Sequence, residues 1–250
     1  MKRRTAFFGC SHTSSIILDR LGESALQDIN FVGMAYRRLD LGEPYGPLWI
    51  YNPVLCGRVT LQEGRLLGTE LFRRMLDELK AADPEILVTA VNGTEHARFS
   101  MVERGCDLVE SEGLSQPIPD RLLARALAKA VEETILVHDV LKDLLPGARI
   151  VSMMPAPPLK EDAHIMENPE VFAGLLQEHG ISSSAYRLRV YRLAYEIVEN
   201  RLAEKGIATL APPEGSTDQD GFLLPELRLG CTHANARYGR MVLDQIDRLQ

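Results

Sequence analysis

The stretch from Thr5 to Thr13 reads TAFFGCSHT, an apolar run that ends in a polar turn. The run from Thr5 to Gly9 predicts a buried first strand, and the turn leads into a helix. A serine on such a turn lies at the mouth of a site, where its hydroxyl can act as a nucleophile. Ser11 holds this position, but serine is also a favoured cap of a following helix. The turn alone leaves both interpretations open.

Short apolar runs farther along the chain predict the other strands. The clearest are Glu85–Val91, which is rich in β-branched residues, and Arg149–Met154, which ends at a run of prolines. Ile207–Ala211 predicts a last short strand. Either Phe31–Tyr36 or Leu48–Tyr51 supplies the second strand.

Amphipathic segments between these runs predict helices. They are Arg65–Ala82, Asp120–Leu145 with Asp120 as its cap, and a segment from Ser183 or Ser184 to Glu204. Asn235 can cap a terminal helix. The inner face of the first helix carries Leu71, Phe72, Met75, Leu76 and Leu79 at steps of three and four.

The alternation of strands and helices predicts an α/β protein with a mostly parallel sheet covered on both faces. We expect one domain spanning residues 1–250. The segment Lys160–Gly180 is polar and irregular, which favours a lid or an insertion. Residues 98–119 and 155–184 are therefore expected to shape a pocket beyond the carboxyl ends of the strands, where ligands bind in such folds.

Composition excludes several classes of protein. The 250 residues contain 28 Lys and Arg against 35 Asp and Glu, a net charge of −7, which argues against a general nucleic-acid binder. No apolar run reaches the roughly 18 residues of a membrane helix. The four cysteines form no Cys-x-x-Cys pair, which favours reduced thiols. We expect a cytoplasmic protein that contacts neither membrane nor nucleic acid.

Polar turns follow the predicted strands at one edge of the sheet. Ser11 follows the first strand, Asn92 and Thr94 follow Glu85–Val91, and His233 lies in the last turn before the terminal helix. Since the carboxyl ends of parallel strands meet at one edge, these side chains can lie close together. The histidine could then act as a base for the serine, and Asn92 or Thr94 could donate a hydrogen bond to an oxyanion.

The order Ser, Asn, His in these turns resembles the SGNH hydrolases, also called GDSL esterases or lipases. Gly9-Cys10-Ser11 stands where the family has Gly-Asp-Ser, with Cys10 in place of the aspartate. His233 matches the histidine of the family's Asp-x-x-His block, whose aspartate position is Gly230. The resemblance covers most of the chain. It implies the SGNH hydrolase fold, a flavodoxin-like three-layer α/β/α sandwich.

The resemblance also implies the parts of an oxyanion hole. The backbone N–H groups of Ser11 and Gly57 would contribute, together with a side chain from the third block. Asn92 keeps the family's asparagine, whereas Gly93-Thr94-Glu95-His96 keeps the rest of a variant block but replaces that asparagine by Thr94. We favour Asn92 as the donor, although both side chains can donate.

By this resemblance the chain is expected to be a serine esterase without a cofactor, acting on a small soluble O-acyl ester such as an acetyl ester. Ser11 would attack the acyl carbonyl and His233 would take its proton. An acyltransferase on the same site is an alternative, as is a non-catalytic protein that binds a ligand or partner. The substrate is expected to be a small molecule, and self-association is left open. The residues expected around the substrate are Cys10, His12, Glu95, His96, Cys231 and Asn235.

Gly230 leaves open which group orients His233, because the aspartate of the family is missing. A backbone carbonyl, Asp218 or Asp220 could replace it, or the site could operate as a Ser-His dyad. Two further alternatives concern the cysteines. Cys10 could be the nucleophile, although the alignment favours Ser11. Zinc is a weaker hypothesis, because its ligands Cys10, His12, Cys231 and His233 would come from two distant turns.

Overall fold

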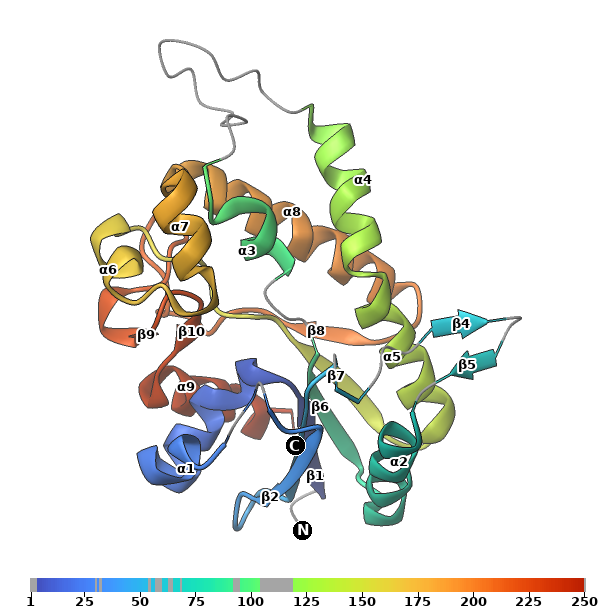
Figure 1. The fold of residues 1–250 in the computed structure, drawn as a ribbon. Helices are drawn as coiled ribbons and strands as arrows, with labels where there is room; N and C mark the ends of the chain where they lie inside the picture. Colours follow the sequence, from blue (N-terminus) through green and yellow to red (C-terminus); the bar gives the residue numbers. More distant parts are fainter. Residues whose placement is uncertain are drawn as a thin grey trace.

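A computed structural model describes residues 4–29, 31, 33–53, 55–56, 60–62, 65–67, 69–91, 95–103 and 119–249. A six-stranded sheet forms the middle layer of the fold (Figure 1). Its strands are, in spatial order, β2 (Tyr36–Asp40), β3 (Pro47–Tyr51), β1 (Thr5–Gly9), β6 (Ile86–Ala90), β7 (Arg149–Met153) and β8 (Ala208–Leu210). All neighbours pair in parallel except β2, which runs antiparallel to β3 at the edge. The expected mostly parallel sheet is confirmed.

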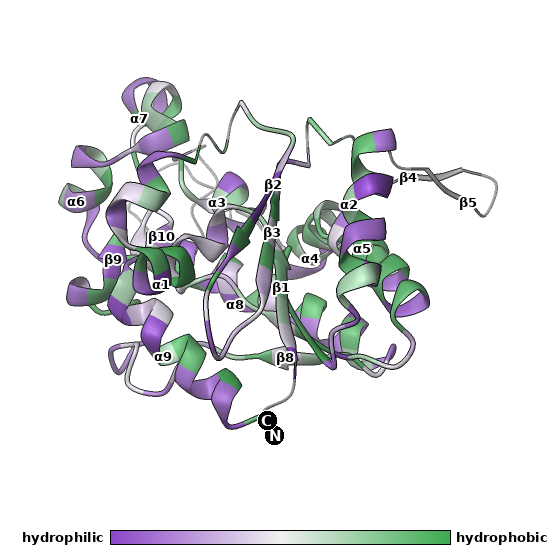
Figure 2. Ribbon diagram, turned by 90° about the horizontal axis from the view of Figure 1, so that it is seen from below, coloured by the Kyte–Doolittle hydropathy of each residue, from purple (hydrophilic) through white to green (hydrophobic). Residues whose placement is uncertain are grey.

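Two helices cover one face of the sheet, namely α1 (Ser14–Gln27) and α9 (Ala236–Asp247). Phe7 of β1 belongs to the same apolar cluster as Ile16 of α1 and Val242 of α9. These buried side chains lie between the sheet and the two helices, and Figure 2 shows green, apolar residues among purple, polar ones along α1 and α9. The first and last helices of the chain thus lie side by side.

The opposite face is covered by α2 (Glu70–Ala82), α5 (Glu132–Leu144) and α8 (Ser184–Ala203). Phe8, the neighbour of Phe7, packs there with Phe72, Leu141 and Val198. Successive side chains of β1 therefore pack into two different cores, because side chains alternate between the two faces of a strand. The result is the expected α/β/α sandwich.

Short elements gather at the carboxyl edge of the sheet. The helices are α3 (Glu95–Ser100), α4 (Asp120–Ala130), α6 (Asp162–Glu167), η2 (Glu170–Phe172), α7 (Ala173–His179) and η3 (Pro225–Leu227). The strands β9 (Arg228–Leu229) and β10 (His233–Ala234) form a small antiparallel pair beside them. We call the segment from Asp162 to His179 the cap. It lies over β9 and β10 (Figure 1).

Several sequence predictions were wrong in detail. The alternative Leu48–Tyr51 coincides with β3 apart from one residue, whereas the run Phe31–Tyr36 overlaps β2 only at Tyr36. Arg65–Ala82 is not one helix, because residues 65–67 form β5 (Arg65–Leu67), which pairs with β4 (Thr60–Gln62). Thr69 caps α2 by accepting a hydrogen bond from the N–H of Phe72, which fixes the later start.

The other differences lie in the second half of the chain. The helix predicted over Asp120–Leu145 is split, because Val131 has φ −87° and ψ 0° between α4 and α5, and the cap position of α4 is Pro119 rather than Asp120. The segment Lys160–Gly180 is helical rather than irregular. Ser183 and Asn235 are confirmed as the residues that cap the N-termini of α8 and α9. Within the described residues, no helix has both the length and the apolar character needed to cross a membrane.

Candidate active site

Ser11 begins the short helix η1 (Ser11–Thr13) at the carboxyl end of β1. The N–H of Cys10 donates to the carbonyl oxygen of Ala90, 3.1 Å away, which ties the turn to β6. Cys10 and Thr13, not Ser11, hold the cap positions of η1 and α1, so the capping interpretation of Ser11 was wrong. The hydroxyl of Ser11 lies instead within hydrogen-bond distance of His233.

His233 approaches Ser11 from the other end of the chain. Its Nε2 atom lies 3.1 Å from Ser11 Oγ, a hydrogen-bond distance that spans 222 positions of sequence. The arrangement follows from the fold, because α1 comes directly after the serine turn and α9 directly after the histidine. The two helices pack against each other, and Asn235 caps α9 by accepting hydrogen bonds from the N–H groups of Arg237 and Tyr238.

Glu170 occupies the far side of the His233 ring. The two oxygens of its carboxylate lie 3.2 and 3.3 Å from His233 Nδ1. Because a carboxylate only accepts hydrogen bonds, the proton of a neutral ring sits on Nδ1, and Nε2 is left to accept the proton of Ser11. The three groups form a hydrogen-bonded series that can move a proton from a serine hydroxyl to an imidazole.

The environment of Glu170 favours its charged form. Its Oε2 also accepts hydrogen bonds from Cys231 Sγ and Thr232 Oγ1, each at 3.2 Å. Burial by itself raises the pKa of this carboxyl, but the hydrogen bonds and the nearby imidazole of His233 outweigh that effect. The pKa therefore lies below its ordinary value, and the carboxylate is charged at neutral pH.

His12 is buried against the catalytic candidate His233. The two rings stack with their centroids 5.0 Å apart and an angle of 30° between their planes. Burial, and then the charges of His233 and His96, hold the pKa of His12 well below its ordinary value. His12 is therefore neutral and presents a flat surface that limits rotation of the His233 ring.

The two cysteines of the site are protonated thiols. Burial raises the pKa of Cys10 to about 11, and its Sγ lies 3.2 Å from the carbonyl oxygen of Ala90. Burial and the charge of Glu170 also raise the pKa of Cys231. Since the thiolate is the nucleophilic form, this environment argues against Cys10 as the nucleophile. The three cysteines in the described part of the chain are free.

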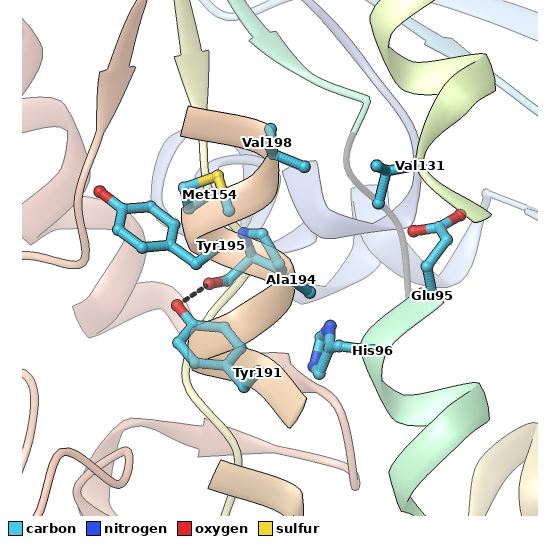
Figure 3. A pocket seen from close by; sticks show the side chains of 9 residues that line it. Glu95, His96, Val131, Met154, Tyr191, Ala194, Tyr195 and Val198 are labelled. Carbon is cyan, nitrogen blue, oxygen red and sulfur yellow. Dashed lines mark hydrogen bonds between the residues drawn. The ribbon is translucent and has the colours of Figure 1, made fainter. Parts of the chain in front are cut away.

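Two small recesses meet at His96. One, of about 20 Å³, lies between α3 and α8, and Figure 3 shows His96 and Glu95 on one side of it with Tyr191 on the other. The rings of His96 and Tyr191 meet edge to face at 5.2 Å, and the Tyr191 hydroxyl donates to the carbonyl oxygen of Pro155. The second recess, of about 10 Å³, reaches Cys231 and Thr232 beside Glu170. Burial lowers the pKa of His96 to about 4, so both recesses border a neutral ring.

The remaining candidates divide into two groups. Gly57, Asn92 and Thr94 lie outside the described residues, so the choice of oxyanion donor stays a prediction. Asn235 uses its side chain in the helix cap and in a hydrogen bond to the carbonyl oxygen of Glu226. It supports the position of His233 and does not line either recess. Among the residues described, no three His, Cys, Asp or Glu side chains are arranged to hold a metal ion.

Glu170 is the site residue that the sequence did not reveal. Asp218 and Asp220, which were considered as partners of His233, are engaged elsewhere. Asp218 accepts from backbone N–H groups of its own turn, and Asp220 pairs with Lys160. The one available signal was Gly230, which leaves the acid position of the Asp-x-x-His block without a carboxylate. Nothing in the sequence selects Glu170 from the five acidic residues between positions 160 and 180.

Among solved structures, the fold is similar to that of a protein described as a platelet activating factor from Streptococcus pneumoniae. The two share 11% sequence identity with a TM-score of 0.51, and the match covers 100% of this chain and 85% of that one. The chain has an SGNH-hydrolase-like fold. The fold inferred from the order of the turns is thus confirmed.

Two other matched structures have lower TM-scores. A GDSL-like lipase from Bacteroides thetaiotaomicron has 11% identity and a TM-score of 0.44, with 99% of this chain and 88% of that chain covered. A carbohydrate acetylesterase from Sinorhizobium meliloti has 12% identity and a TM-score of 0.47, with 99% and 98% covered. The sequence itself matches no family model and no curated protein.

Proposed function

We propose that the chain is a serine hydrolase that cleaves a small O-acyl ester. The observation that carries this proposal is the 3.1 Å contact between Ser11 Oγ and His233 Nε2 at the carboxyl edge of a parallel sheet. A hydroxyl becomes a useful nucleophile when a base accepts its proton, and an imidazole whose Nε2 carries no proton is such a base.

The reaction would proceed in two halves. Ser11 Oγ attacks the acyl carbon while its proton moves to His233 Nε2, and the imidazolium then gives that proton to the departing alcohol. A water molecule, deprotonated by the same nitrogen, next attacks the acyl-serine and regenerates the hydroxyl. The backbone N–H of Ser11, at the start of η1, would donate to the oxyanion in both halves.

The recesses near the pair favour a short acyl group. They have room for about 20 and 10 Å³, on the order of one water molecule each. The recess between α3 and α8 is lined mainly by apolar side chains, including Val131, Met154 and Ala194. Neither recess has room for a long lipid chain, so we expect an acetyl or similarly short group.

Labelling with a serine-directed fluorophosphonate tests the proposal. The wild-type protein should be labelled at Ser11, Ser11→Ala should not be labelled, and His233→Ala should react more slowly by at least about 100-fold. Ser24→Ala, which changes an exposed serine of α1, is the matched control and should behave as wild type.

Thermal unfolding of each variant separates loss of the site from loss of the fold. A folded wild-type protein that resists the probe and also fails to cleave a panel of short-chain activated esters would contradict the proposal. It would favour a protein that only binds a ligand at this site. Labelling that persists in Ser11→Ala would refute Ser11 as the nucleophile.

A further inference from the structure

We propose that Glu170, carried by the cap, is the residue that positions His233, and that Gly230 is a glycine because the Glu170 carboxylate fills the space beside it. This inference rests on the proposed function and extends it to a third residue. It differs from the expectation drawn from the family, which places the acid three positions before the histidine.

The contacts of Glu170 are those expected of a residue that orients the His233 ring. Both carboxylate oxygens lie within 3.3 Å of His233 Nδ1, while Cys231 and Thr232 donate to Oε2. Only 32% of the Glu170 side chain is exposed, compared with 18% for His233. A carboxylate held by several donors keeps its charge and its place, which are the two properties needed to orient an imidazole.

Gly230 shows that the two placements of the acid exclude each other. A Cβ atom at position 230 would lie 2.0 Å from Glu170 Oε1 and 2.7 Å from its Cδ, both far inside van der Waals contact. Gly230 also has φ +63°, in the left-handed region that glycine adopts without strain. Any side chain here, including the family's aspartate, would displace the Glu170 carboxylate.

Contacts of the cap hold Glu170 in an unfavourable backbone conformation. Glu170 has φ +48°, in the left-handed region that is unfavourable for a residue with a Cβ. Phe172 and Ile165 on either side of it are buried in the same core as Cys231. His164 adds a contact of 3.2 Å from its Nε2 to the carbonyl oxygen of Gly230, so the cap is attached to the same turn that Glu170 faces.

Arg187 anchors the start of the cap. Its side chain is 1% exposed and donates hydrogen bonds to the carbonyl oxygens of Leu159, Lys160 and Ser182 and to the carboxylate of Asp162. The guanidinium thus joins α8 to the chain that enters α6. A strained residue held by such contacts on both sides is typical of functional sites.

Kinetics with 4-nitrophenyl acetate tests the assignment. Glu170→Gln should lower kcat by about 10³–10⁴-fold with little change in KM, since the residue touches His233 and not the substrate. Formate should restore part of the kcat of Glu170→Ala, whereas chloride at equal ionic strength should not. Glu167→Gln, an exposed change in the same cap, is the control and should match wild type.

A double-mutant cycle tests the role of Gly230. Gly230→Ala alone should lower kcat by displacing the carboxylate, but it should cost little more in the Glu170→Ala background, because there is no carboxylate left to displace. Additive losses would overturn the explanation of Gly230. Wild-type kcat in folded Glu170→Gln would overturn the role of Glu170.

A measurement independent of catalysis separates this inference from the proposed function. In ¹⁵N-histidine-labelled protein, with His233 assigned from His233→Gln, the neutral ring should carry its proton on Nδ1. Glu170→Gln should shift it toward a mixture of tautomers. A wild-type ring protonated on Nε2 would refute the inference even in an active enzyme. An inactive wild type with the Nδ1 proton would instead refute the proposed function alone.

Discussion

Gly239→Ala should separate the two helices that bring Ser11 and His233 together. Gly239 lies in the first half of α9, and a Cβ there would be 2.0 Å from the carbonyl oxygen of Ser15 and 2.4 Å from its carbonyl carbon in α1. Both atoms belong to the backbone, so no rotamer change relieves the overlap. Since real Cβ contacts stay beyond 3.0 Å, the helices must move apart by about 1 Å.

The energetic consequence combines two opposite effects. Replacing a helical glycine by alanine favours the helix by about 1 kcal/mol, whereas overpacking a close interface costs about 1–3 kcal/mol. The variant should therefore be neutral to about 2 kcal/mol less stable. Its activity should fall much more, because a misplacement of about 1 Å in a catalytic pair can cost about 100-fold.

Thermal unfolding and the rate of fluorophosphonate labelling measure the two effects separately. Gly174→Ala is the matched control, since Gly174 lies in α7 with no atom within 4 Å of its would-be Cβ. That variant should keep its labelling rate and be as stable as wild type or slightly more so. Wild-type labelling by Gly239→Ala would refute the view that the α1–α9 contact sets the distance between serine and histidine.

Arg187→Leu should lower the free energy of unfolding, measured by urea denaturation, by about 3 kcal/mol, because it leaves buried carbonyl oxygens without donors. Arg189→Leu is the control. It removes an ion pair with the exposed Asp120 and should lower the free energy of unfolding by less than about 1 kcal/mol. The folded pKa of Glu170 lies below its ordinary value of 4.5, so the stability that its charge contributes is complete above that pH and is lost as pH falls through the folded pKa. The stability advantage of wild type over Glu170→Gln should accordingly shrink as pH falls below about 4.5. An advantage that grows in acid would contradict this. Because burial raises the pKa of Cys10 to about 11, iodoacetamide at neutral pH should leave it unmodified, and Cys10→Ala should keep the labelling of Ser11.

Local patterns predicted the parts of the fold that depend on short-range order. The first strand, Thr5–Gly9, was predicted to the residue, because an apolar run that stops at a polar turn has few other interpretations. The spacing of apolar residues in Asp120–Leu145 could not show the break at Val131, since both helices keep their apolar faces toward the protein. Likewise, Arg65–Leu67 has no pattern that distinguishes a short hairpin strand from the first turn of a helix.

The site shows the same division between local and long-range information. The closeness of Ser11 and His233 could be predicted, because each lies in a turn at the carboxyl edge, where the fold class itself brings turns together. Glu170 does not lie in the turn directly after a strand but farther on, beyond β7 and α6, and its left-handed backbone leaves no signature in a glutamate. Its role depends on how the cap packs over β10, which is a tertiary property that the sequence pattern does not express.

If the proposed reaction is right, Ser11 carries the acyl group between its two transfers. Acid quenching during turnover of an activated acetyl ester, followed by digestion and mass spectrometry, locates that group directly. We predict acetylation of the peptide that contains Ser11, with none on that peptide in Ser11→Ala. An acetyl group on another residue, with the Ser11 peptide unmodified and turnover intact, would contradict it.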